Sequence, residues 1–388
     1  MRRFVSNKLI FKVLKISVPK ELKPFEKRVA LTPDVVKSLI KSGFEVVIEK
    51  GAGEGSYFSD DTYLQAGASI TSKDEVYSTA DVVLKVNAPE AEEVMLMKEK
   101  AVLISFMYAY TNPALVDACL QKQISSFAMD AVPRISRAQK MDALSSQANL
   151  AGYKAVLAGA NAIGKIFPLM MTAAGTITPA KVVIFGAGVA GLQAVATAKR
   201  LGALVEVTDV RPETKEQVES LGGRFLQVEG AEQVKTEGGY AKEVSAEYLQ
   251  KQKELVSKHV AEADLVITTA LVMGKKAPVL VTEDMVKSMK TGSAIVDMAV
   301  ESGGNCELSE LNKTVVKHGV TIIGESNLPA LLPVNASELY AKNISTLLLH
   351  LASKDGFKWE MDEDITKGSV ITHQGELLHS LTKDILKK

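Results

Sequence analysis

The sequence predicts an α/β protein of two Rossmann-like domains with parallel sheets, joined by long helices and with a cleft between them. Its 388 residues amount to roughly two and a half typical domains, so two domains are the expected number. Short β-branched segments alternate with helical segments along most of the chain, which is typical of a parallel sheet covered by helices. In the middle of the chain, one such strand leads directly into a glycine-rich turn, the connection on which Rossmann folds are built.

The first domain is expected to start with a strand at Lys15–Val18. A helix should follow at Pro33 and end before Gly43, because proline suits the first turn of a helix and glycine the position after its end. Later strands of this domain are predicted at Glu45–Glu49, Asp81–Val86, Ala101–Phe106 and Ser125–Met129. The basic segment before the first strand is either a targeting sequence or a poorly ordered arm, and the role or processing of residues 1–14 stays open.

Two long helices are predicted to join the domains. Ser145–Ile166 is rich in alanine and free of proline, and should leave the first domain; Gly175–Pro179 is then predicted to be a loop. Ser337–Ala352 should return to the first domain. The first domain is therefore expected to comprise residues 1–143 and 328–388, and the second residues 144–327. The tail after the second helix shows no strong periodicity.

The second domain is expected to begin with a strand at Lys181–Phe185, followed by the glycine turn and a helix at Gly191–Arg200. Its later strands are predicted at Leu204–Thr208, Leu265–Thr269, Ala294–Asp297 and Val320–Ile323. Between them, Gly222–Tyr248 is rich in glycine and charge. This long excursion is either a functional lid or an irregular insertion.

The glycine turn has the spacing of a dinucleotide site. Gly186 permits the tight turn, Gly188 allows a pyrophosphate to approach the backbone, and Gly191 lets helix and strand pack closely. The N-terminus of the following helix offers free N–H groups to the anion. Asp209, at the end of the next strand, suits a ribose 2′-hydroxyl and favours NAD over NADP, although Arg211 is a residue type that can bind a 2′-phosphate.

Composition excludes several classes of function. Lys+Arg and Asp+Glu both number 46, so zero net charge argues against nucleic acid or an anionic membrane surface as the main partner. Only Cys119 and Cys306 are present, which excludes a disulfide framework and offers no metal-binding pattern. No apolar run reaches the roughly 18 residues of a membrane span. A soluble protein of a reducing compartment without a metal is expected.

A general acid or base is hard to find. The five histidines fall in predicted helices, at a helix end or in the tail, and none is expected to be catalytic. Polar residues instead gather before the first long helix: Arg134, Ser136, Arg137, Gln139, Asp142, Ser145, Ser146 and Gln147. Spacings of three would place Gln139, Asp142 and Ser145 on one side of a helical turn, with Arg134 paired to Asp142. The cluster is either a solvated helix cap or part of a ligand site at the junction of the domains.

Several long strings resemble the alanine dehydrogenase/transhydrogenase family, and the resemblance extends from about Leu14 onward. The strings are Val18–Glu21, Arg28–Pro33, Gly51–Ser56, Val83–Val86 and Ser145–Tyr153. The alanine dehydrogenases of this family have a catalytic lysine, histidine and aspartate at three positions. In this chain the corresponding residues are Asn87, Tyr108 and Glu301, in that order. The arginine that binds the substrate carboxylate is retained as Arg28. The resemblance thus implies loss of the proton-transfer groups for an amino acid.

The segment Arg134–Asp142 is similar to the Arg-Gln-Asp loop of the NAD(H)-binding component of proton-translocating transhydrogenases. By this resemblance Arg134, Gln139, Asp142 and Ser145 orient the nicotinamide. Gly238–Lys242 resembles the mobile loop of that component, with Tyr240 closing over the nucleotide. The further nucleotide contacts that it implies are Ile135, Ser136, Val189, Asp209, Val210, Arg211, Gly239, Gln252 and Leu271.

The resemblance implies hydride transfer from NADH on this chain to NADP⁺ on a partner subunit, coupled to proton translocation. Direct transfer between two nicotinamide rings needs positioning and exclusion of water rather than an acid or base. The implied partners are a second copy through Pro333–Ile344, an NADP(H)-binding beta subunit and a membrane-spanning subunit. The chain would then be peripheral, on the cytoplasmic side of a bacterial inner membrane or the matrix side of a mitochondrial one. The alternatives are an NAD-dependent alanine dehydrogenase and a catalytically idle NAD-binding regulator.

Overall fold

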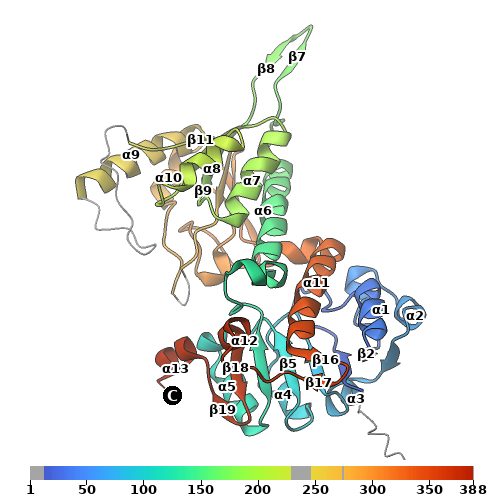
Figure 1. Cartoon of the computed structure of the whole chain (residues 1–388). Helices are drawn as coiled ribbons and strands as arrows, with labels where there is room; N and C mark the ends of the chain where they lie inside the picture. The colour runs from blue at the N-terminus through green and yellow to red at the C-terminus, as the bar shows by residue number, and fades with distance from the viewer. Residues whose placement is uncertain (1–12, 229–245, 273–274, 388) are drawn as a thin grey trace, which may run out of the picture. The chain divides into compact units, whose positions relative to one another are not determined.

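The computed structural model describes residues 13–228, 246–272 and 275–387, with side chains of the helix at 246–262 described from residue 250. These residues form two compact units (Figure 1). Unit 1 contains the chain up to Gln147 together with the chain from Pro333 onward, and unit 2 contains Ala148–Leu332. The predicted α/β class with two Rossmann-like, parallel-dominated domains is confirmed.

Unit 1 is built on an eight-stranded sheet in the order β19-β18-β6-β5-β4-β1-β2-β3. Its strands are β1 (Lys15–Val18), β2 (Glu45–Glu49), β3 (Ser69–Thr71), β4 (Val82–Leu84), β5 (Val102–Ser105), β6 (Ser125–Ala128), β18 (Val370–His373) and β19 (Glu376–Leu377). The first six are parallel, whereas β18 runs antiparallel to both β6 and β19. The tail, for which no strand was predicted, therefore adds two antiparallel strands to the edge of the predicted parallel sheet.

Helices cover both faces of this sheet because its strands are apolar on both sides. Val82 and Leu84 pack into the core beneath α1 and α11, while Val83 points into the core on the opposite face. The helices of unit 1 are α1 (Pro33–Lys41), α2 (Asp60–Gln65), α3 (Lys73–Ser78), α4 (Ala91–Leu96), α5 (Pro113–Gln121), α11 (Pro333–Leu351), α12 (Asp364–Ser369) and α13 (Ser380–Leu386). Short 3₁₀ helices are η1 (Glu54–Ser56), η2 (Ala109–Thr111) and η3 (Ser136–Met141), and β16 (Ala352–Ser353) pairs with β17 (Gly356–Phe357).

The long helices differ slightly from their predicted bounds. Helix α6 spans Ala143–Ala162, so it begins earlier and ends earlier than predicted. Helix α11 begins at Pro333, four residues before its predicted start, because proline fits its first turn. Its buried face, which includes Tyr340, Ala341 and Ile344, packs within the core of unit 1.

Unit 2 contains a seven-stranded sheet in the order β11-β10-β9-β12-β13-β15-β14. Its strands are β9 (Lys181–Phe185), β10 (Leu204–Thr208), β11 (Arg224–Phe225), β12 (Leu265–Thr268), β13 (Ala294–Asp297), β14 (Thr314–Lys317) and β15 (Val320–Ile323). Only β14 is antiparallel to its neighbour among these described strands. The strand order reverses between β9 and β12, which makes the carboxyl ends of these strands the expected place for a ligand.

The helices of unit 2 flank this sheet. They are residues 148–162 of α6, α7 (Val189–Arg200), α8 (Thr214–Ser220), α9 (Ala246–Glu262) and α10 (Glu283–Ser288), with 3₁₀ turns η4 (Val300–Ser302) and η5 (Leu328–Leu331). Among the described residues, no helix has both the length and the apolar character needed to cross a membrane.

A hairpin of unit 2 was missed at the sequence level. Strands β7 (Met170–Thr172) and β8 (Gly175–Ile177) pair antiparallel, and β8 lies within the predicted loop Gly175–Pro179. The hairpin projects from the unit in Figure 1, and both strands are exposed along their length.

Candidate nucleotide site

The glycine turn after β9 has the geometry that its sequence predicts. Gly186 has φ of +98°, and its N–H donates to the carbonyl of Thr208 over 2.8 Å. A Cβ on Gly191 would lie 1.8 Å from the carbonyl oxygen of Gly186, so only glycine fits this crossing of helix and strand. Gly188 instead has open space, since the nearest heavy atom to an added Cβ is Arg211 Nη2 at 3.9 Å. Helix α7 begins directly afterwards at Val189, with its N–H groups at the turn.

Asp209 is fixed at the end of β10 by donors on both carboxylate oxygens. Oδ2 accepts from Ala187 N at 2.6 Å and Arg211 Nη2 at 2.8 Å, and Oδ1 accepts from Arg211 N at 2.8 Å and Nε at 2.9 Å. The side chain is 4% exposed. Burial alone would raise the pKa of Asp209, but the Arg211 guanidinium and the backbone N–H groups outweigh it and hold the pKa below its usual range. The carboxylate is therefore ionised at neutral pH.

Of the other predicted contacts in unit 2, Val210 and Leu271 follow the carboxyl ends of β10 and β12, and Gln252 lies in α9. Val210 and Leu271 are exposed. Gln252 of α9 donates from Nε2 to Thr208 Oγ1 at 3.1 Å and to the carbonyl of Leu226 at 3.2 Å. Its buried Oε1 has no hydrogen-bond partner among the described residues. Gly239 and Tyr240 lie outside the described residues.

A buried asparagine and aspartate shape the loop after β12, and neither was among the predicted site residues. Asn305 is fully buried; its Oδ1 accepts from Ala270 N at 3.0 Å, and its Nδ2 donates to the carbonyls of Ala270 and Pro278. Asp297, also fully buried, accepts from the side chain of Thr268 and from the N–H of Asn305. These contacts hold the backbone beside Leu271. Polar residues at the carboxyl ends of β12 and β13 were the available signal.

In unit 1 the Arg-Gln-Asp segment does not form the continuous helical turn that was predicted. Gln139 lies in η3, whereas Asp142 has φ −72° and ψ 83° and precedes α6. Its carboxylate accepts from Ser145 N at 2.8 Å and from Ser145 Oγ at 2.6 Å. The predicted Arg134–Asp142 ion pair is wrong, because the two carboxylate oxygens face Ser145 instead and the Arg134 side chain is exposed.

The remaining predicted residues of this segment lie beside it. Ser136 and Gln139 are exposed, and Ile135 is half-buried against the core of unit 1. Asn343 of α11 holds the segment in place, since its Nδ2 donates to the carbonyl of Lys140 at 2.9 Å and its Oδ1 accepts from Ser146 Oγ at 2.7 Å. Asn343 was not predicted, because its partners lie about half a chain away in sequence.

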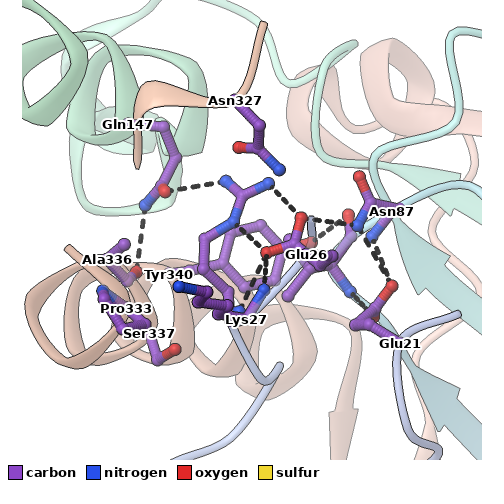
Figure 2. Close-up of polar contacts among 12 residues, drawn as sticks. Glu21, Glu26, Lys27, Asn87, Gln147, Asn327, Pro333, Ala336, Ser337 and Tyr340 are labelled. Atoms are coloured by element: carbon purple, nitrogen blue, oxygen red, sulfur yellow. Dashed lines mark hydrogen bonds and ion pairs between the residues drawn. The ribbon is translucent and has the colours of Figure 1, made fainter. Parts of the chain in front are cut away.

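Arg28 is buried and hydrogen-bonds to Glu26 and Gln147. Figure 2 shows the polar contacts around Glu26, Gln147 and Asn87. The Nε and Nη2 of Arg28 donate to the two carboxylate oxygens of Glu26 at 2.9 and 2.7 Å, and its Nη1 donates to Gln147 Oε1 at 2.9 Å. Asn87 Nδ2 donates to both Glu21 Oε2 at 3.1 Å and Glu26 Oε2 at 2.8 Å. Burial would raise the pKa of Glu26, but Arg28 and Asn87 lower it to about 2. Both hydrogens of the Asn87 amide are thus directed at carboxylates.

The two other positions at which dehydrogenase groups are replaced are structurally distinct. Tyr108 has a left-handed backbone with φ of 44°, and its N–H and that of Met107 donate to the carboxylate of Asp130. Its ring stacks on Phe106 with centroids 5.9 Å apart. Glu301 is exposed in η4 of unit 2. Within the described part of the chain, no group of three potential metal ligands occurs.

Comparison with known proteins extends over both units. The model of the alanine dehydrogenase/PNT N-terminal domain matches residues 17–151, and that of the C-terminal domain matches residues 155–380. A polypeptide of NAD(P) transhydrogenase subunit alpha from Rhodospirillum rubrum is 51% identical over 376 residues, which cover 94% of this chain and 98% of that polypeptide. Alanine dehydrogenase 2 of Staphylococcus aureus is 32% identical, with 88% of each chain covered.

Among solved structures, transhydrogenase from Sinorhizobium meliloti superposes with a TM-score of 0.86 at 45% identity, covering 94% of this chain and 99% of that one. The matched domain models, the identity and the shared fold agree with the glycine turn and with the strings quoted from the sequence. The chain belongs to the alanine dehydrogenase/PNT family.

Proposed function

We propose that this chain is the NAD(H)-binding subunit of a proton-translocating transhydrogenase, in which hydride passes from NADH to NADP⁺ on a partner subunit. The family binds NAD(H), and relatives named NAD(P) transhydrogenase subunit alpha support a transhydrogenase role. The observation that carries the proposal is Asn87. Its amide hydrogens bridge Glu21 and Glu26, and an amide neither takes up nor releases a proton at neutral pH.

NAD(H) binding is proposed at the carboxyl ends of β9, β10 and β12. The turn around Gly188 has room for a pyrophosphate beside the N-terminus of α7. The ionised Asp209 supplies the acceptor for the adenosine ribose. Val189, Val210, Gln252 and Leu271 are proposed as the surrounding contacts, and Gly239 and Tyr240 as contacts from residues that the structure does not describe.

Nicotinamide positioning is proposed for Arg134, Gln139, Asp142 and Ser145, with Ile135 and Ser136 beside them. The short bonds between Asp142 and Ser145 fix both side chains before a ligand arrives. Such preorganisation raises the rate of a reaction whose only requirement is to bring two rings into register. The chain's task is therefore to hold one nicotinamide and exclude water from the transfer.

The partners are proposals of the same kind. They comprise an NADP(H)-binding beta subunit, a membrane-spanning subunit and a second copy of this chain, with the assembly on the cytoplasmic side of a bacterial inner membrane or on the matrix side in mitochondria. The designation "subunit alpha" in the relatives supports partner subunits in general. For the homodimer, Pro333–Ile344 offers Asn335, Leu339 and Lys342 as exposed residues, while half of the segment is buried within unit 1.

One reconstitution tests the proposal against its rivals. The chain is mixed with the NADP(H)-binding component of a transhydrogenase, and hydride transfer is followed between the two nucleotides with a distinguishable NAD analogue. Transfer that requires both proteins supports the proposal. Alanine-dependent NADH formation by the chain alone would identify an alanine dehydrogenase, and tight NADH binding without either activity would identify an idle NAD-binding regulator.

A further inference from the structure

Arg211 lies at the mouth of the glycine turn, yet its guanidinium is bound to Asp209. Nε and Nη2 meet the two carboxylate oxygens at 2.9 and 2.8 Å, the fork-shaped geometry in which arginine binds carboxylates and phosphates alike. The side chain of Arg211 is 46% exposed, whereas that of Asp209 is 4% exposed. Nη2 is also the nearest atom to the space above Gly188. Arg211 thus lies at the proposed nucleotide site and could bind a phosphate, but its positive charge is already neutralised by Asp209.

We propose that Arg211 is a latent ligand for the 2′-phosphate of NADP(H) and that Asp209 keeps it from acting as one. This inference rests on the proposed NAD(H) site. Asp209 then selects against NADP(H) because its bidentate hydrogen bonds hold Arg211, the cation that would otherwise attract a 2′-phosphate. The bonded pair has no net charge, so a phosphate dianion gains nothing by approaching it.

The hydrogen-bond capacity of Asp209 supports this inference. An ionised carboxylate has about four lone-pair positions. In this structure four donors occupy them, two on each oxygen: Ala187 N and Arg211 Nη2 on one, Arg211 N and Nε on the other. A ribose hydroxyl can therefore bond to Asp209 only when a donor gives way. The exposed guanidinium is the donor that can move, because the two backbone N–H groups are fixed by the turn.

The contacts around Asp209 and Arg211 are consistent with movement of the Arg211 side chain away from the carboxylate. Thr214 Oγ1 donates to the carbonyl of Arg211 at 2.7 Å, which anchors the backbone of Arg211 without involving its side chain. The nearby carboxylate that acts on Arg211 besides Asp209 is Glu213, in the same exposed segment. Without the negative charge of Asp209, the guanidinium would retain a full positive charge beside the adenosine ribose position.

The test compares NADH and NADPH affinities of the full chain by titrating the fluorescence of bound reduced nucleotide. Asp209→Asn should bind NADPH at least about 10-fold more tightly than the wild type does, with a steeper dependence on salt, and should bind NADH more weakly. Asp209→Asn combined with Arg211→Gln should lose the gained NADPH affinity. Arg211→Gln alone is the matched control and should not gain NADPH affinity.

Failure of the inference and failure of the proposed function have different signatures. No gain of NADPH affinity in Asp209→Asn, or a gain that persists when Arg211 is replaced, overturns the role of Arg211. Absence of NADH binding by the wild-type chain overturns the nucleotide site itself. Because the asparagine amide could face the N–H of Ala187, Asp209→Ser is measured in parallel, and thermal unfolding confirms that each variant is folded.

Discussion

Two glycines of the same turn should respond to alanine in opposite ways. At Gly191 the added Cβ would lie 1.8 Å from the carbonyl oxygen of Gly186, and ordinary contacts begin at 3.4 Å. The two backbone segments must therefore separate by about 1.6 Å. At Gly188 the Cβ meets no protein atom nearer than 3.9 Å, and the backbone, with φ of −77°, suits any residue. Gly191→Ala thus perturbs folding, and Gly188→Ala perturbs only what binds there.

The magnitudes follow from these distances. Forcing extra atoms into a packed crossing costs about 1–3 kcal/mol and occasionally more, and the clash between backbone atoms places Gly191→Ala at about 3 kcal/mol or above. For a domain of about 150–250 residues this lowers Tm by roughly 6–12 °C. Gly188→Ala should change the free energy of unfolding by no more than about 0.5 kcal/mol. It should weaken NADH binding at least about 10-fold, which corresponds to about 1.4 kcal/mol, because its methyl group occupies the path of the pyrophosphate.

The assay pairs thermal unfolding with NADH titration on the wild type and both variants. A Gly191→Ala protein as stable as the wild type would refute the close crossing of α7 and β9. A Gly188→Ala protein that is stable and binds NADH with unchanged affinity would refute the approach of the pyrophosphate to this turn. Equal losses of stability in both variants would show that the turn tolerates no side chain at either position, contrary to the open space at Gly188.

Three further changes test other regions of the chain. Asp142→Asn should slow hydride transfer in the reconstituted system much more than it weakens NADH binding, and equal losses would argue against a positioning role. The pKa of Glu26 is lowered from 4.5 to about 2, so its ionised form stabilises unit 1 by up to about 3 kcal/mol above pH 4.5. That contribution is lost as the pH falls from 4.5 to about 2. Glu26→Gln should therefore flatten the acid end of a curve of unfolding free energy against pH. Asp297→Asn should lower the free energy of unfolding by about 3 kcal/mol in urea titrations, because several buried donors lose a carboxylate acceptor. The control is Asp284→Asn, which should have no measurable effect because that side chain is 93% exposed.

The buried parallel strands could be predicted from sequence because their own residues determine them. Lys181–Phe185 and Leu204–Thr208 are β-branched runs buried on both faces or on alternate residues, and the structure has β9 and β10 at those bounds. The hairpin of β7 and β8 was missed because its residues are exposed and carry no apolar alternation. Strand β18 was missed because four residues show no period, and its place depends on β6, whose Ser126 Oγ contacts Thr372 Oγ1 across 246 positions.

The residues of the candidate site also divide into those that local sequence predicts and those that depend on the folded structure. The distance in sequence between the glycine turn and Asp209 is a local feature of a strand–helix–strand unit, so the motif predicts that Asp209 reaches the turn, and its carboxylate does bond to Ala187 N. The hydrogen bonds of the Arg211 side chain to Asp209 could not be predicted, because they depend on the rotamers of both side chains. Asn305 was not predicted either, since its partners Ala270 and Pro278 lie 35 and 27 positions away and meet it only after the sheet has formed.

The chemistry of the polar groups in unit 1 favours hydride transfer without proton transfer. An amino acid dehydrogenase must remove a proton from nitrogen, and a base for that purpose needs a free lone pair at neutral pH. Asn87 has an amide, whose nitrogen is not basic, and its hydrogens are committed to Glu21 and Glu26. The Asp142 carboxylate accepts from Ser145 N with one oxygen and from Ser145 Oγ with the other, which fixes both side chains. These side chains are held in fixed positions, and positioning is the main requirement of a reaction between two nicotinamide rings.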